Sequence, residues 1–180
     1  MVALDCDYFR ALETPRMATL SPNLVAAVFP LMKLMPARYI LDRAAADGGI
    51  KAGAHIVETT SGTFGMALAL LSAARRYQLT LITASSLIDA KYTERLERLG
   101  AVVTIVEDSS GNGDQLRRLQ CLEHVRRDDP NCFWPRQYDN PGNWLAYARL
   151  AELNSPEFRG RPRVTFPAAF RTRRVTASRF

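Results

Sequence analysis

The sequence predicts an α/β fold in which a parallel sheet is flanked by helices. Three short apolar runs have the length of buried strands: 55–58, 79–84 and 101–106. A segment with helical character follows each of them: 66–77, 89–99 and 115–127. Strands that alternate with helices of about 10 to 15 residues are typical of β-α-β units, so we expect parallel strands joined by right-handed crossovers.

Start and stop residues support these boundaries. An earlier helix ends at the alanines 44–46 and is followed by Gly48 and Gly49, which stop a helix. The helix over 89–99 presents Leu96 and Leu99 to the core and stops at Gly100. Asp114 follows a glycine-containing loop, and its side chain can cap the helix that begins at the next residue.

Charge divides the chain into two unequal parts. The formal charge is +6, and the segment from residue 157 onward, with seven arginines and one acid, accounts for all of it. We therefore expect a partial α/β region over 1–153, with a smaller domain at about 40–140, and an arginine-rich, disordered tail over 154–180. Such a tail can bind nucleic acid or an acidic membrane, but it has no interleaved aromatic motif. A tail that does not fold, produced by a disrupted reading frame, is the preferred interpretation.

Composition bounds the cellular setting. No run of about 18 apolar residues exists, so no transmembrane helix is expected. Acids near the first residue argue against a secretory signal. The three cysteines, Cys6, Cys121 and Cys132, are widely spaced and form no C-x-x-C pair, so neither a metal site nor a redox couple is expected. The sequence predicts a cytoplasmic protein with no membrane and no nucleic-acid partner.

The turn after the first strand is the strongest chemical feature. Gly62 permits a tight turn, and Ser61 and Thr63 lie where a helix begins. The first N–H groups of a helix lack intrahelical partners, and together with the helix dipole they attract a carboxylate or a phosphate. Simple capping of the helix by Ser61 or Thr63 is an alternative that the local sequence leaves open.

Residues 58–69, which read E-T-T-S-G-T-F-G-M-A-L-A, resemble E-A/P-T-S-G-N-T-G-I-A-L-A of the cysteine synthase / cystathionine β-synthase family, which are fold-type II PLP-dependent enzymes. Residues 92–101 and 137–143 resemble that family's R-x-x-L-x-x-x-G-A and Q-F-x-N-P-A-N, in the same order. The resemblance covers about 28–152. It implies an incomplete fold-type II architecture, pyridoxal 5′-phosphate as cofactor, a small amino-acid substrate and a homodimer.

The reaction implied by the resemblance belongs to cysteine biosynthesis. Members of the family replace the β-substituent of O-acetylserine-type substrates to give cysteine or a related amino acid. Their T-S-G-N-T loop grips the substrate α-carboxylate, which assigns that role to Thr60, Ser61, Gly62 and Thr63. Gln137 matches a glutamine with the same role, and Thr63 stands where the family's asparagine contacts the cofactor.

The lysine of the family is not found where the resemblance places it. The family reads S-x-K-D-R, and here Leu41 precedes Asp42-Arg43, so no catalytic residue is assigned. A leucine cannot bond covalently to the cofactor. Of the three lysines in the chain, Lys33 is nearest but is expected on a strand, whereas Lys51 and Lys91 are expected at the surface.

A second motif, the family's G-T-G-G-T phosphate loop, does not occur in the sequence. Three readings therefore remain: an enzyme of this family, a non-catalytic amino-acid-binding relative, and a truncated remnant. A dinucleotide site is disfavoured because the turn is not G-x-G-x-x-G. We expect structural roles for the remaining candidates, which are His55, Glu58, His124, Trp134 and Trp144.

Overall fold

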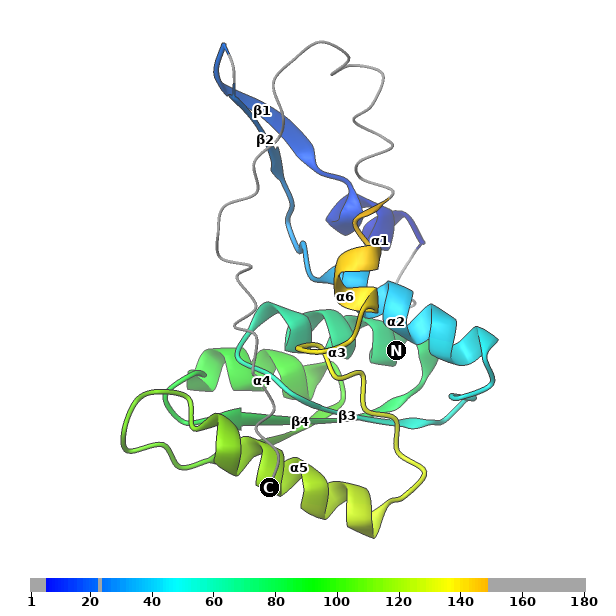
Figure 1. Ribbon diagram of the computed structural model, residues 1–180, viewed down its shortest axis with the longest axis vertical. Helices are drawn as coiled ribbons and strands as arrows, with labels where there is room; N and C mark the ends of the chain where they lie inside the picture. The colour runs from blue at the N-terminus through cyan, green and yellow to red at the C-terminus, as the bar shows by residue number, and fades with distance from the viewer. Residues whose placement is uncertain (1–5, 23, 149–180) are drawn as a thin grey trace, which may run out of the picture.

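The structure is a computed structural model that describes residues 6–22 and 24–148. The expectation for the tail over 154–180 lies outside the described residues. The elements follow in the order α1 Cys6–Glu13, β1 Arg16–Ser21, β2 Leu24–Val28, α2 Leu34–Ala46, β3 His55–Thr59, α3 Thr63–Arg75, β4 Gln78–Ala84, α4 Ala90–Arg98, β5 Ala101–Val106, α5 Gln115–Asp128 and α6 Gly142–Leu145. Their arrangement is drawn in Figure 1.

The predicted parallel sheet is confirmed. Its strands are ordered β3-β4-β5, and both pairs are parallel, with Ile56 beside Leu79 and Leu79 beside Ala101. The predicted cap at Asp114 is confirmed, since its side chain accepts a hydrogen bond from Arg117 N, and Asp89 accepts one from Tyr92 N in the same way. The α/β prediction with flanking helices therefore holds for the part of the chain that the structure describes.

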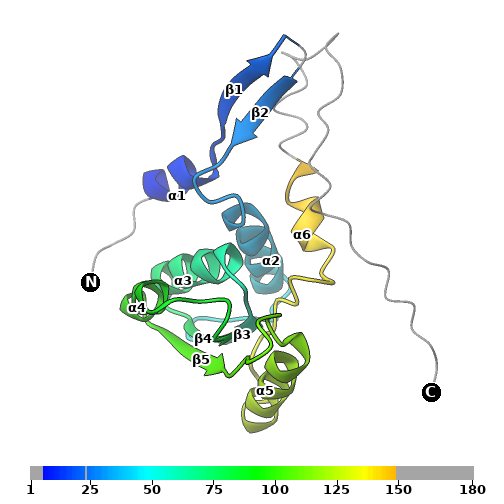
Figure 2. The ribbon, with the colours of Figure 1, turned by 90° about the vertical axis from the view of Figure 1, so that its left-hand side faces the viewer.

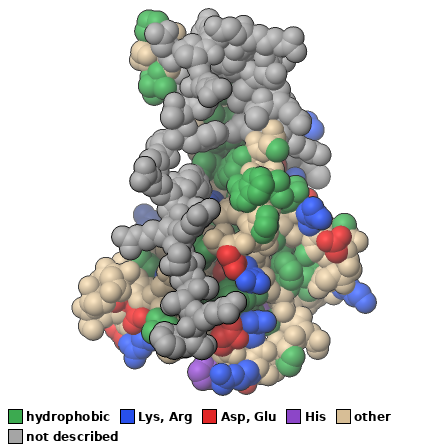
Figure 3. All heavy atoms as spheres, in the orientation of Figure 1, with side chains coloured by type: hydrophobic (Ala, Val, Ile, Leu, Met, Phe, Trp, Pro, Cys, Tyr) green, Lys and Arg blue, Asp and Glu red, His purple; other side chains and the backbone are tan. Residues whose placement is uncertain are grey.

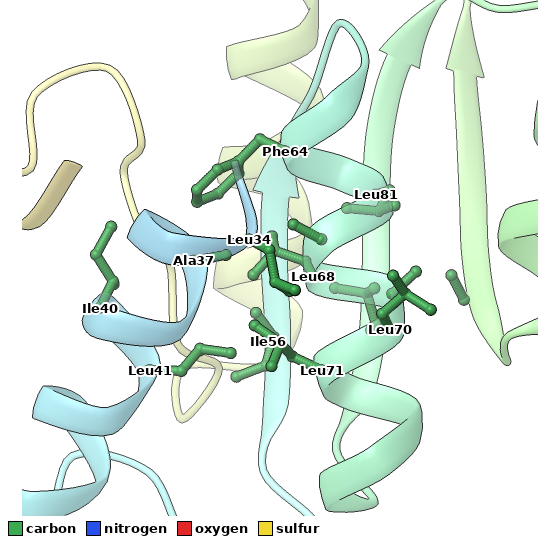
Figure 4. Packing of buried hydrophobic residues seen from close by; sticks show 14 of the residues in the cluster. Leu34, Ala37, Ile40, Leu41, Ile56, Phe64, Leu68, Leu70, Leu71 and Leu81 are labelled. Atoms are coloured by element: carbon green, nitrogen blue, oxygen red, sulfur yellow. The ribbon is translucent and has the colours of Figure 1, made fainter. Parts of the chain in front are cut away.

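Helices cover both faces of this sheet. Figures 1 and 2 show α2, α3 and α4 on one side and α5 on the other. Side chains alternate between the two faces of β3, as the pleat requires. Ile56 joins the larger core with α2 and α3, whereas Val57 packs with Ile82 and Leu122 beneath α5. Figure 4 shows the larger core, where leucines of α2 and α3 meet Ile56.

The N-terminal hairpin was not foreseen from the sequence. β1 and β2 pair antiparallel and project away from the body of the molecule, as Figure 2 shows. Pro15, Pro22 and Pro30 lie just outside the two strands, where a missing N–H removes no ladder hydrogen bond. The hairpin exposes Leu20 by 63% and Leu24 by 48%.

One irregular segment extends the sheet beside β3. Phe133 N donates to His55 O at 2.7 Å, and Val57 N donates to Phe133 O at 2.9 Å. This parallel bridge aligns residues 133–137 with β3, so that the chain reaches Gln137 beside the end of the strand. The segment then continues into α6, over which hydrophobic side chains gather in Figure 3, Trp144 being 67% exposed.

Among the helices of the described ranges, none has the length and apolarity that crossing a membrane requires.

Candidate functional site

The carboxyl ends of the three parallel strands meet at one edge of the sheet. The loops that leave this edge contain Thr60 after β3, Ser85 and Ser86 after β4, and Asp108 after β5. Ligands of open parallel sheets bind outside the carboxyl ends of the strands. The predicted carboxylate loop therefore lies at the edge where a ligand site is expected.

Thr60 organises the turn between β3 and α3. Its hydroxyl oxygen accepts hydrogen bonds from Gly62 N at 3.2 Å and from Gly65 N at 3.1 Å. Gly65 packs directly on this threonine, since an added Cβ would lie 2.8 Å from Thr60 Cγ2. Gly62 adopts φ 157° and ψ −122°, a conformation that side-chain-bearing residues rarely adopt. The glycine pattern of the motif thus has a direct steric reason.

Ser61 and Thr63 are exposed, and neither caps the helix. The N-cap position of α3 is Gly62, and no side-chain hydrogen bond is recorded there, while Thr60 engages the first turn instead. The capping alternative for Ser61 and Thr63 is therefore not supported, and their hydroxyls face solvent at the N-terminus of α3. Phe64, the next residue, turns inward and is 2% exposed.

Gln137 lies against this loop although it is distant in sequence. Its side chain is buried, and Nε2 donates to Thr59 O at 2.8 Å. Its backbone N–H donates to Glu58 Oε2 at 3.0 Å. The structure thus brings together all five predicted substrate-binding residues, from Thr60 to Thr63 and at Gln137, on one edge.

Glu58 is completely buried at the end of β3. Its Oε1 accepts from Thr59 N and from Trp134 Nε1, both at 2.9 Å. Burial raises the pKa of the Glu58 carboxyl from 4.5 to about 7, against the lowering effect of the N–H donors of Gln137, Trp134 and Thr59. A carboxyl that changes charge near neutrality therefore lies directly behind the loop.

Lys33 occupies a different place from the one expected. It is the N-cap residue of α2 rather than part of a strand, because Pro36 starts a helix that the apolar run around it had obscured. Its Nζ donates to Asn143 Oδ1 at 3.4 Å, and Asn143 Nδ2 donates to Gln137 O at 2.6 Å. Burial lowers the pKa of the Lys33 amine below its usual 10.5. A half-buried amine is thereby connected to the Gln137 segment.

Leu41, the residue at the place that the resemblance gives to the lysine, is not brought to this edge. It is fully buried in the middle of α2 and lies beside Ile56 and Leu71, as Figure 4 shows. The neighbouring Asp42 points to the surface and accepts a hydrogen bond from Arg75 at 2.5 Å. Lys51 and Lys91 are both exposed, as expected.

Two residues of the site had no recognisable signal in the sequence. Arg118 of α5 is 5% exposed; its Nε donates to Gly113 O at 2.7 Å, and its Nη1 lies 3.5 Å from Thr60 O. Tyr92 of α4 donates from its hydroxyl to Gly62 O at 3.0 Å. Both reach the loop from helices that follow other strands, so only the folded topology brings them together.

Comparison with known proteins shows the family to which the chain belongs. A family model described as pyridoxal-phosphate dependent enzyme matches residues 32–164. The chain belongs to this family. Its match therefore confirms the resemblance to PLP-dependent, cysteine-synthase-like proteins that the three motifs indicated.

Individual relatives of this PLP family agree. An N-(2-amino-2-carboxyethyl)-L-glutamate synthase of Ralstonia nicotianae is 32% identical over 117 residues, which are 64% of this chain and 34% of that protein. The structure of an O-ureido-L-serine synthase superposes with a TM-score of 0.69 at 24% identity, covering 86% of this chain and 51% of the other. A cysteine synthase of Entamoeba histolytica gives 0.69 at 20% identity, covering 80% and 46%.

The chain spans about a third of the length of the Ralstonia relative and about half of the two solved structures. At their level of identity the structures show the fold alone. The PLP-family fold is thus shared, and what the chain binds has to be argued from its own residues.

The residues present fit part of the cofactor that the family implies. Lys33 supplies a half-buried amine that is linked through Asn143 to Gln137, and Thr63 supplies an exposed hydroxyl at the N-terminus of α3. A phosphate cradle of the G-T-G-G-T type is missing from the sequence. No group of three or more His, Cys, Asp or Glu side chains that could hold a metal occurs within residues 6–22 and 24–148.

Proposed function

We propose that this chain forms the amino-acid-gripping part of a PLP-dependent enzyme that carries out β-replacement on an O-acetylserine-type substrate. The observation that carries the proposal is a continuous hydrogen-bonded path from Lys33 through Asn143 and Gln137 to Thr59. That path connects an amine and an amide with the end of β3, from which the loop leads to the N-terminus of α3. Those are the groups needed to attach a carbonyl cofactor and to hold a carboxylate.

In this proposal the substrate carboxylate is bound by Thr60, Ser61, Gly62 and Thr63 together with Gln137. The exposed hydroxyls of Ser61 and Thr63 donate to it, and the dipole of α3 favours its negative charge. Thr60 holds the turn in shape from within. Arg118 adds a buried positive charge behind Thr60, which also favours an anion at this edge.

We further propose Lys33, rather than the Leu41 position, as the attachment point of the cofactor. A lowered pKa leaves more of an amine neutral near pH 7, and the neutral amine is the nucleophile. When bound, PLP supplies an electron sink for the bonds at the α-carbon of the substrate. Lys33 would hold the carbonyl carbon of the cofactor, and Thr63 would lie near the ring of the cofactor.

Calorimetry with L-serine tests the carboxylate site. We expect saturable heat with L-serine and none with ethanolamine, which has the same amine and hydroxyl but no carboxylate. Ser61→Ala and Thr63→Ala should each weaken binding, while Thr14→Ala, which alters an exposed hydroxyl next to α1, should not. Equal binding of the two compounds would contradict the proposal.

Chemical trapping tests the lysine. The protein is incubated with PLP, the linkage is reduced with borohydride, and the modified peptide is identified by mass spectrometry. We expect modification at Lys33, its loss in Lys33→Arg, and its retention in Lys51→Arg and Lys91→Arg, which alter exposed lysines. Modification spread equally over the three lysines would reject Lys33.

A non-catalytic amino-acid-binding protein is the second candidate. Leu41, which stands where the resemblance places the lysine, favours it, because a leucine cannot bond covalently to the cofactor. It predicts serine binding without any trapping of PLP. A truncated remnant, by contrast, predicts neither binding nor a cooperative thermal transition.

The proposal includes a cytoplasmic setting and a homodimer. Cys121 and Cys132 are free and partly buried, which suits a reducing compartment. Sedimentation equilibrium would measure the dimer directly.

A further inference from the structure

Glu58 forms the joint between the end of β3 and the segment that carries Gln137. Its Oε1 accepts the N–H groups of Thr59 and Trp134, and its Oε2 accepts the N–H of Gln137. The two long-range contacts span 76 and 79 residues of sequence. One side chain therefore fixes the position of Gln137 relative to the carboxylate loop.

All three groups hydrogen-bonded to this carboxylate are N–H donors. An ionised carboxylate accepts only, so it suits these three donors. A protonated carboxyl has one acceptor site fewer and an O–H of its own, and none of the three N–H groups that contact it can accept that proton. Because hydrogen bonds to a charged acceptor are the stronger ones, protonation weakens the hold of this carboxyl on Trp134 and Gln137.

Charged side chains lie around Glu58, and the two arginines near Trp134 pair with other acids. The Arg126 and Arg136 guanidinium carbons lie 5.3 Å and 5.5 Å from the centroid of the Trp134 ring, and each also pairs with an acid nearby, Glu123 and Asp139. The titratable and charged groups that approach from the surrounding elements are Arg118 and Arg126 of α5, Arg136 and Cys132 of the adjacent segment, His55 of β3 and Lys33 of α2.

We infer that Glu58 is a positioning residue of the carboxylate site: its ionised form holds Gln137 against the loop, and its protonation loosens that hold. The inference rests on the proposed function and deepens it by adding a control of substrate grip by pH. Since burial raises the pKa of Glu58 to about 7, the change falls within the neutral range.

Tryptophan fluorescence reads the joint directly. The chain has two tryptophans, so Trp144→Phe leaves Trp134 as the single indole, whose N–H bonds to Glu58. We expect one emission transition with a midpoint near pH 7, and its loss when Glu58→Gln is added. Histidines titrate in the same range, so His55→Gln serves as the control and should keep the transition. Persistence in Glu58→Gln, or loss in His55→Gln, would overturn the inference.

The pH dependence of L-serine binding tests the link to the site. If only the ionised form grips the ligand, the apparent affinity should be about tenfold weaker at pH 6 than at pH 8, since the competent fraction falls by that factor. Glu58→Gln should bind with no such dependence. Trp134→Phe removes one donor to the carboxylate, so it should move the midpoint of the wild-type dependence to higher pH, and this variant serves if Glu58→Gln fails to fold.

These outcomes separate the two claims. Serine binding that is independent of pH in the unmodified chain would overturn the positioning role and leave the proposed function intact. Absence of serine binding at every pH would overturn the proposed function and the positioning role together.

Discussion

Two carboxylates lie at the same edge of the sheet, Glu58 at the end of β3 and Asp108 after β5, and they behave in opposite ways. Both accept three hydrogen bonds. Those to Glu58 come from N–H groups only, whereas Asp108 accepts from the hydroxyls of Ser86 and Ser110 and from Gly113 N at 2.6 Å. Hydrogen bonds from the two serines lower the pKa of Asp108 to about 2, whereas burial raises that of Glu58 to about 7.

The difference shows that the number of donors does not by itself decide the charge of a carboxyl group. Glu58 is completely enclosed, so the loss of hydration outweighs its three donors. Asp108 is 8% exposed, but the residues on either side of it are exposed, so two hydroxyls outweigh a smaller loss of hydration. At neutral pH Asp108 is thus charged, whereas Glu58 changes charge in that range.

The largest expected effect is on the pH dependence of stability. Because the folded pKa of Glu58 is raised above its ordinary 4.5, the folded state binds the proton more tightly than the unfolded chain. As the pH rises from 4.5 to about 7, deprotonation of Glu58 should therefore lower the free energy of unfolding progressively, by roughly 3 kcal/mol in total. Urea unfolding at about pH 5 and about pH 8 should show this loss in the wild type and not in Glu58→Gln. Parallel behaviour of the two proteins would contradict it.

The next effect concerns the packing of Gly65 against Thr60. Gly65→Ala would place a methyl group 2.8 Å from Thr60 Cγ2 and 2.9 Å from Thr60 Oγ1, so we expect a loss of about 2 kcal/mol from overpacking. Chemical denaturation measures it. Adding Thr60→Ser removes the nearest carbon and should restore part of the stability; strict additivity of the two changes would reject this contact as the cause.

A smaller effect is expected at the turn itself. Tyr92→Phe removes the hydroxyl that donates to Gly62 O at 3.0 Å, which should cost about 1 kcal/mol. Tyr138→Phe is the matched control, since that side chain is 50% exposed, and should leave the urea midpoint unchanged. Equal losses in both variants would show that the Gly62 contact does not stabilise the turn.

The smallest pH effect is expected at Asp108. Its folded pKa of about 2 lies below the ordinary 3.8, so its stabilisation is complete above pH 3.8 and is lost as the pH falls through about 2. Asp108→Asn should therefore melt at a lower temperature than the wild type by an amount that is constant between about pH 5 and about pH 8. A difference that changes within this range would remove the contrast with Glu58.

The sheet and its flanking helices were predictable because their signals are local. The strand at 101–106 was predicted with the boundaries that the structure gives it, and Asp114 caps α5 as expected. The caps and glycine stops fix each helix within a few residues of sequence, so no tertiary information was needed.

The rest depended on contacts that the sequence does not display. The N-terminal hairpin lacks the Asn-Gly type of turn that would announce it, and Pro22 lies between its strands instead. Lys33 was expected on a strand because its neighbours Met32, Leu34 and Met35 are apolar, although Pro36 in the first turn is a helix-start signal. Glu58 and Gln137 meet across 79 residues, which no local pattern could reveal.

Alignment of residues 133–137 with β3 has a consequence for synthesis on the ribosome. A bacterial or eukaryotic ribosome adds about 5 to 20 residues per second, and the N-terminal part emerges first. Lys33 and the β3 turn both leave the exit tunnel long before Gln137 and Asn143, because the contacts of Glu58 with Gln137 and of Lys33 with Asn143 span 79 and 110 residues. During those seconds the loop lacks Gln137 and Lys33 lacks Asn143, so the proposed ligand can bind only after the late segment has folded back onto β3.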